Sequence, residues 1–147
     1  MSAYSFLSVN AALVGPGGAL SLGAGAGNAE EGIDIEPTTE INTMTIGADG
    51  SYMHSLSGNK SGKITIRLLK TSPVNQQLQA LYNYQTANPL YHGQNTLSIA
   101  DTARGDVVTC QGVAFNKATP LKYAEKGNFN EWLFDAGVID RVLGPGI

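Results

Sequence analysis

The sequence predicts a mainly β fold, a β-sandwich or barrel-like domain with one flanking α-helix, which covers residues 1–147 as a single domain. Three observations favour this class. Short segments of alternating apolar and polar residues recur along the chain, turn residues separate them, and only one segment has helical spacing. A chain of this length buries a sizeable core, and its one cysteine excludes an internal disulfide.

The clearest alternation lies in residues 63–69, where Ile64 and Ile66 point to one face and Lys63 and Thr65 to the other. The other predicted strands are residues 3–14, 33–36, 41–47, 51–57, 95–101, 106–118 and 130–143. About eight short strands and one helix are typical of a sandwich or barrel with the helix on its flank.

The two ends of the chain carry further alternation. In residues 3–14, Tyr4, Phe6 and Ser8 are predicted to share one face of a strand. Near the C-terminus the aromatic pair Trp132 and Phe134 is predicted to face the core. The residues that alternate with this pair, and are therefore expected on the opposite face, are Glu131, Leu133 and Asp135.

The single helix is predicted over residues 73–86. Ser72 is a suitable N-cap, Pro73 suits the first helical position, and Asn88–Pro89 ends the helix. The spacing of its apolar residues predicts a core face made of Val74, Leu78, Leu81 and Tyr82.

Two hairpin turns are indicated. Asp49–Gly50 lies between two alternating segments, and its backbone requires a positive φ that glycine adopts easily. Asp101 and Asp106 flank a second turn near Gly105, where their side chains are expected to bond the local backbone rather than to form a catalytic carboxylate pair.

A glycine- and alanine-rich stretch, residues 15–32, has no clear strand or helix period. A dinucleotide-binding loop requires a third glycine and a following helix, and both are missing here. A linker is disfavoured because no second domain exists for it to connect. We therefore expect an ordered loop that contacts a neighbouring subunit, together with an alternating segment able to pair with a sheet edge; the residues concerned are Gly23, Gly25, Gly27, Glu30, Glu31, Ile33 and Ile35.

No residue pattern supports catalysis, a metal or a cofactor. Residues 58–63 resemble a phosphate-binding loop but have one residue too few between the glycines, and Ile64 stands where Ser or Thr is required. Cys110 lies in an apolar segment typical of a buried thiol, and nothing places His54 or His92 beside it. The net charge of −3 disfavours general nucleic-acid binding. The N-terminus lacks the pattern of a signal peptide, so we expect a protein kept in the cytosol or in a particle assembled there.

Several segments, taken together, resemble the tail tube proteins of contractile-tailed bacteriophages. These segments run along nearly the whole chain, and the most distinctive are MTIGADGS (residues 44–51) and LLKTSPVN (residues 68–75). The resemblance implies a β-sandwich with one flanking helix, a fold shared with the tube proteins of type VI secretion systems. It also implies hexameric rings stacked into a hollow tube inside a sheath, with baseplate and terminator proteins as further partners and genomic DNA passing through the lumen. The implied location is the tail of the virion, assembled in the host cytoplasm.

A DNA conduit requires a neutral or acidic lining, because a basic lining would retain the phosphates. Strand alternation makes Glu131 and Asp135 the first candidates for the lumen, followed by Asp106 and Asp140. The alternative is that these carboxylates pair with basic residues across subunit contacts and stabilise the ring; the basic residues considered are Lys63, Arg67 and Arg104.

Other functions remain open at this stage. A tube protein of a type VI-like injection system has the same fold, and a sheath or baseplate protein is a further structural alternative. A small ligand-binding barrel would have a charge-rich surface, which the 14% charged content disfavours against about 25% in ordinary soluble domains. An enzyme is disfavoured because no polar constellation is present.

Overall fold

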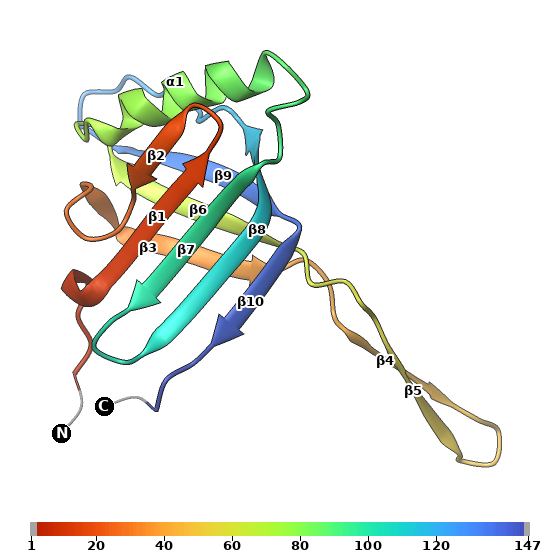
Figure 1. Ribbon diagram of the computed structural model, residues 1–147. Helices are drawn as coiled ribbons and strands as arrows, with labels where there is room; N and C mark the ends of the chain where they lie inside the picture. Colours follow the sequence, from red (N-terminus) through yellow and green to blue (C-terminus); the bar gives the residue numbers. More distant parts are fainter. Residues whose placement is uncertain (1–2, 146–147) are drawn as a thin grey trace.

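The computed structural model describes residues 3–145 and shows ten strands, one α-helix and one short 3-10 helix in this part of the chain (Figure 1). The helices are η1 (Phe6–Ser8) and α1 (Val74–Thr86). The strands are β1 (Val9–Gly15), β2 (Gly18–Ser21), β3 (Asn28–Pro37), β4 (Asn42–Ile46), β5 (Tyr52–Leu56), β6 (Gly62–Leu69), β7 (Asn95–Asp101), β8 (Asp106–Lys117), β9 (Phe129–Ala136) and β10 (Val138–Val142).

Eight of these strands form one antiparallel sheet in the order β2-β1-β7-β8-β9-β6-β3, with β10 also paired to β8. The long strand β8 joins two layers, because its first half pairs with β7 and β10 and its second half pairs with β9. Gly112, at the point of change, has a φ of 64°. We call β2, β1, β7, β10 and the first half of β8 the first layer, and β3, β6, β9 and the second half of β8 the second layer.

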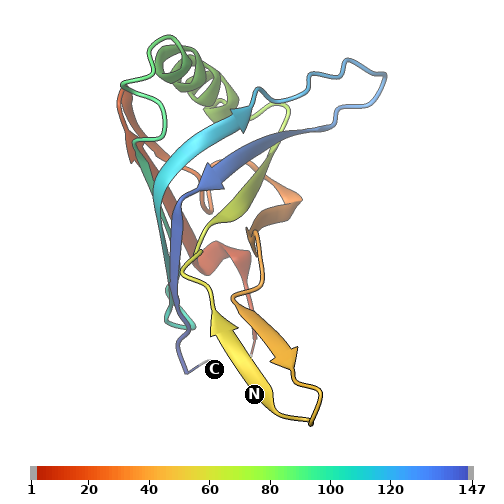
Figure 2. The same cartoon turned by 90° about the vertical axis from the view of Figure 1, so that its right-hand side faces the viewer.

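The strands of the two layers cross steeply and enclose the core between them (Figures 1 and 2). Across the second layer, Ile66 lies opposite Trp132 and Ile64 opposite Phe134, and all four side chains are buried. The predicted mainly β sandwich with one helix is confirmed. Within residues 3–145 the strands do not close into a barrel, since β2 and β3 end the sheet as separate edges.

The predicted alternation of the first segment is wrong in phase. Residues 6–8 form the helical turn η1, in which the Leu7 amide donates to Ser5 Oγ at 3.1 Å, and β1 begins only at Val9. A helical turn rotates the chain by a different angle per residue than a strand does. The buried side chains of β1 are therefore those of Val9, Ala11 and Leu13.

The predicted strand 130–143 is divided at Gly137 into β9 and β10. The Gly137 amide donates to the Gln111 carbonyl at 3.0 Å, and the chain passes there from the second layer to the first. The alternation predicted for the first part is present, since Trp132 and Phe134 are buried and Glu131 and Asp135 point away from the core.

Helix α1 closes one end of the sandwich (Figure 1). It begins at Val74, one residue later than predicted, and the Val74 amide donates to Ser72 Oγ at 3.3 Å. Of the predicted core face, Leu78 and Leu81 are buried, whereas Val74 and Tyr82 are half-buried. Two polar contacts fix the helix to the sheet: Trp132 Nε1 donates to Asn75 Oδ1 at 3.0 Å, and the amides of Gln85 and Asn95 exchange two hydrogen bonds.

Candidate assembly surfaces

A two-stranded hairpin leaves the body of the molecule and contacts neither layer along its length (Figures 1 and 2). We call residues 38–61, which contain β4 and β5, the arm. At its tip Gly50 has a φ of 88°, and Asp49 Oδ1 accepts hydrogen bonds from the amide and the hydroxyl of Ser51. These hydrogen bonds, that of the hydroxyl first, hold the pKa of Asp49 below its usual value. The sequence predicted this turn because Asp–Gly supplies both the side-chain acceptor and the positive φ.

Both faces of the arm are exposed, and both carry large apolar side chains. Every residue from 38 to 60 is exposed. The large apolar residues, with exposed fractions between 53% and 81%, are Ile41, Met44, Ile46, Tyr52, Met53 and Leu56. An isolated two-stranded hairpin is marginally stable in water. A hairpin of this composition is therefore suited to burial against another molecule.

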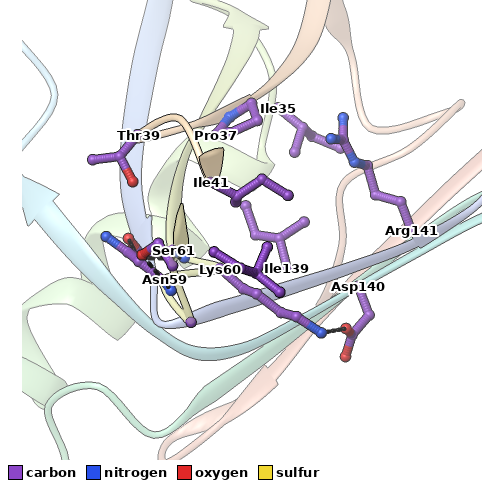
Figure 3. Close-up of a pocket in the computed structure, with 13 residues that line it drawn as sticks. Ile35, Pro37, Thr39, Ile41, Asn59, Lys60, Ser61, Ile139, Asp140 and Arg141 are labelled. Atoms are coloured by element: carbon purple, nitrogen blue, oxygen red, sulfur yellow. Dashed lines mark hydrogen bonds and ion pairs between the residues drawn. The ribbon is translucent and has the colours of Figure 1, made fainter. Parts of the chain in front are cut away.

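The base of the arm forms an open groove of about 620 Å³ beside β3 and β10 (Figure 3). Its apolar lining comes from Ile35, Ile41 and Ile139. Lys60 lies at the rim, with Nζ 3.9 Å from Asp140 Oδ1, and its carbonyl accepts from the Ile139 amide at 2.9 Å. These contacts anchor the base of the arm to the first layer.

Residues 15–32 are not one loop, which corrects that part of the sequence prediction, whereas the predicted contact with a neighbouring subunit stays a prediction. They contain β2 and the beginning of β3, and the segment between these strands packs on the core through Leu22 and Ala26. A Cβ at Gly23 would lie 2.6 Å from the Ala11 amide nitrogen, so this glycine permits close packing within the chain. Small residues allow a close approach of any backbone, and sequence alone does not show that the neighbouring backbone is the chain's own.

The remaining residues predicted for this contact lie in or beside β3. Gly25 is exposed and Gly27 is half-buried, with φ values of 95° and 79°. Ile33 and Ile35 pair with β6 and are packed against the core. Glu30 and Glu31 belong to β3, but their side chains lie outside the described residues. Strand β3 ends the sheet, so its second edge has no partner strand among the described residues.

The four predicted lumen carboxylates do not lie together. Glu131 and Asp135 are on the outer face of the second layer, whereas Asp140 is on the outer face of the first. Asp106 lies where the β7–β8 turn meets β8, and its Oδ1 accepts from the Gly144 amide at 2.8 Å. Sequence spacing gives the face of each strand but not the layer to which the strand belongs.

The outer face of the second layer carries a charged cluster. Arg67 lies 2.7 Å from Asp34 through Nη1 and 3.6 Å from Glu131 through Nε. Asp135 accepts from the Asn116 side-chain amide at 2.8 Å. The Arg67–Glu131 pair shows that one candidate carboxylate has a basic partner within its own chain. The sequence analysis placed such pairs across subunits. The sequence does not show the register between β6 and β9, so it could not place Arg67 opposite Glu131 within one chain.

The described residues offer no arrangement typical of catalysis. They contain no cluster of three His, Cys, Asp or Glu side chains able to hold a metal. Cys110 is buried, and burial raises the pKa of its thiol to about 11, which keeps it protonated and unreactive at neutral pH. His54 pairs with Asn42 across the arm, far along the chain from Cys110. None of the described helices is long and apolar enough to cross a membrane.

One surface was not predicted. Residues 117–128, which we call the basic loop, run from the last residue of β8 to the start of β9 and contain Lys117, Lys122 and Lys126. Lys70, which follows β6, donates from Nζ to the Lys122 carbonyl and lies 4.0 Å from the centre of the Tyr123 ring. The signal in the sequence was a run of three lysines within ten residues, next to exposed apolar side chains.

The architecture is shared with solved components of contractile injection systems. The cap that terminates the tube of the anti-feeding prophage is 8% identical to this chain, with a TM-score of 0.57. The similarity covers 98% of this chain and 93% of that one. A chain of an extracellular contractile injection system in its sheath-tube complex is 13% identical, with a TM-score of 0.55 and coverages of 90% and 88%. A chain of the sheath/tube terminator of the same kind of system is 14% identical, with a TM-score of 0.61 and coverages of 97% and 98%.

The family follows from the sequence. The model of the Bacteriophage PhiTE tail tube protein family matches residues 1–144, and the chain belongs to this family. A search of curated proteins by sequence found no match. The resemblance inferred from the residues is confirmed, and the chain is a structural protein of the tail-tube type.

Proposed function

We propose that this chain forms the inner tail tube of a contractile-tailed phage, as hexameric rings that stack into a hollow conduit for the genome. The exposed apolar arm is the observation that carries this proposal. A monomer with the arm in water would expose a large apolar surface and a marginally stable hairpin. Stacked copies bury it, and a head-to-tail contact that does not close on itself makes a filament.

The partners and the location follow from the same assignment. A tube of this kind lies inside a sheath and ends at a terminator and a baseplate, within a tail assembled in the host cytoplasm. The family match and the similar chains of sheath-tube and terminator complexes support this proposal. A tube protein of a non-phage contractile injection system is the second candidate, favoured by the same similar structures.

We further propose that the outer face of the second layer lines the lumen. Its carboxylates are Asp34, Glu36, Glu131 and Asp135, against the basic residues Lys63, Arg67 and Lys117. Arg67 is paired with two of these carboxylates, and the four carboxylates outnumber the three basic residues by one, so the face carries a small net negative charge. Such a lining repels DNA phosphates and lets the duplex slide.

Electron microscopy of the purified protein tests the assembly. We expect rings with six-fold symmetry and hollow tubes built from them. A protein that stays monomeric at all concentrations and salt conditions, or that forms only solid aggregates, would contradict the proposal. A tube with another symmetry would contradict the hexamer while leaving the tube.

A further inference from the structure

The charges of this chain are separated along its length. Residues 30–59 contain six carboxylates and no lysine or arginine, although the net charge of the whole chain is only −3. Asp34 is paired with Arg67. Glu36 and Glu40, on either side of the point where the arm begins, are exposed and form no ion pair with another described residue. Lys60, at the end of the arm, lies 3.9 Å from Asp140, and Lys63 lies opposite Glu36 in the pairing of β3 with β6. The arm is therefore apolar, and its base carries two exposed carboxylates for which no ion pair is present among the described residues.

The basic loop has the complementary composition. It contains three lysines against one carboxylate, Glu125, and two exposed apolar side chains, Leu121 at 61% and Tyr123 at 82% exposure. Lys122 and Lys126 form no ion pair among the described residues. The contacts of Lys70 with the Lys122 carbonyl and the Tyr123 ring hold the loop against the end of β6. A surface held in place loses less conformational entropy when it binds.

The arm and the basic loop lie at opposite ends of the same strands. The arm leads directly into β6 at Gly62, and β6 ends at Leu69, which pairs with Phe129 at the end of the basic loop. The eight residues of β6 separate the two surfaces by about 25 Å at the usual rise of a strand. The arm points away from the loop of its own chain (Figures 1 and 2), so the two cannot meet within one molecule.

We infer that the basic loop of one copy receives the arm of the next copy, with Glu36 and Glu40 facing Lys122 and Lys126. The contact is heterologous, because an acidic arm does not bind a second acidic arm. Copies displaced from one another along the direction of β6 can each repeat this contact, and the series of copies does not close on itself. This inference rests on the proposed tube and adds the receiving surface and the charge pairs that select it. The apolar side chains supply buried area, and the charges supply orientation.

Charge reversal tests the contact. One variant reverses the arm, Glu36→Lys with Glu40→Lys, and the other reverses the loop, Lys122→Glu with Lys126→Glu. Each variant alone places like charges against each other, and we expect its assembled fraction in sedimentation velocity to fall at least about tenfold at low salt. The two variants mixed in equal amounts present opposite charges at both surfaces. We expect the mixture to recover association to near the wild-type level.

Salt and a control separate this contact from general effects of charge. Raising the salt from 0.1 to 1 M shortens the Debye length from about 10 Å to about 3 Å, so wild-type association should weaken while each single variant improves. Arg104→Glu, in the turn between β7 and β8 and away from both surfaces, should assemble like the wild type. Circular dichroism melting checks that each variant folds. If a charge-reversed variant does not fold, a neutral substitution on the same surface takes its place: Glu40→Gln for the arm and Lys122→Gln for the basic loop.

The outcomes separate the inference from the proposed function. If wild-type tubes form and both reversed variants also assemble normally, or if mixing them restores nothing, the inference is wrong and the tube remains. If the wild type forms no tubes, the proposed function fails. The association of the two variants in the mixture, compared with each alone, still decides whether the arm binds the basic loop.

Discussion

At the scale of single residues, close backbone approaches decide which small side chains matter. Gly23 lies against β1, where a Cβ would meet the Ala11 amide nitrogen at 2.6 Å and the Val9 carbonyl oxygen at 2.7 Å. Gly58, in the arm, has no atom within 4 Å of the position of a Cβ. The same residue type therefore has a packing role in one place and none in the other.

Gly23→Ala should destabilise the fold by at least about 2 kcal/mol, because the atoms it meets are backbone and cannot move aside as a side chain can. Chemical denaturation monitored by fluorescence of Trp132 measures the free energy of unfolding. Gly58→Ala is the matched control and should be within about 0.5 kcal/mol of the wild type. Equal effects of the two substitutions would contradict the close packing of Gly23.

Cys110 should contribute a loss of stability at alkaline pH. Burial raises its pKa to about 11 in the folded state, from the ordinary 9.0 of an exposed thiol, so folding favours the protonated thiol. This contribution is fully present below pH 9 and is lost as the pH rises from 9 through 11. The free energy of unfolding of the wild type should therefore fall more steeply over this range than that of Cys110→Ala. Parallel pH profiles would show that the thiol is not buried as described.

At the scale of elements, the helix and the arm illustrate opposite relations to the core. Helix α1 is fixed by buried leucines and by hydrogen bonds from Trp132 to Asn75 and between Gln85 and Asn95. The arm shares only its base with the body. A change in the helix should therefore affect the stability of the whole domain, whereas a change in the arm should affect assembly.

Leu78→Ala and Leu81→Ala should each cost about 2–5 kcal/mol, because both side chains are buried between the helix and the sandwich. Gln76→Ala, on the exposed side of the same helix, should change the free energy of unfolding little, since alanine is the better helix former. Urea denaturation compares the three variants. A Leu78→Ala variant as stable as the wild type would contradict the docking of the helix.

Gly50→Val should disturb the arm but not the body. A β-branched residue resists the φ of 88° at this position, and no atom of the body lies within 4 Å of the Cβ. Because the arm is separate from the core, we expect an unchanged melting temperature with reduced tube formation. Hydrogen exchange should show lost protection confined to β4 and β5, and normal tubes would contradict the role of the arm.

At the scale of the whole molecule, the two outer faces differ in charge. The outer face of the second layer carries the cluster around Arg67, whereas Asp140 is the one charged residue among the outward-facing, paired positions of β1, β2, β7, β8 and β10 in the first layer. A tube has only one lumen, so only one of the two faces can contact the passing DNA. Lysines introduced on that face should slow DNA ejection, whereas lysines on the other face should not.

Replacing Glu131 and Asp135 with lysine should leave tubes that assemble but virions that eject DNA more slowly, because the lysines bind phosphates as they pass. The defect should ease as salt is raised. Thr96→Lys, on the outer face of the first layer, is the control and should eject normally. Slow ejection by Thr96→Lys alone would place the lumen on the first layer, and loss of rings in the double variant would indicate a role in subunit contact.

The sequence by itself determined the elements that depend on near neighbours. Alternation defined the buried faces of β6 and β9, Asp49–Gly50 defined the turn of the arm, and Ser72–Pro73 gave the start of α1 to within one residue. Each of these signals is local, since it reflects the backbone preferences and the periodicity of a few consecutive residues. The family resemblance was also contained in the residues themselves.

Only the tertiary structure decided how these elements meet. It placed Gly23 against β1, divided residues 130–143 between two layers at Gly137, and separated Glu131 from Asp140. It also placed the acidic arm and the basic loop at opposite ends of β6. These relations depend on register and layer order between strands distant in the chain, and such pairings follow from the packing of the whole core.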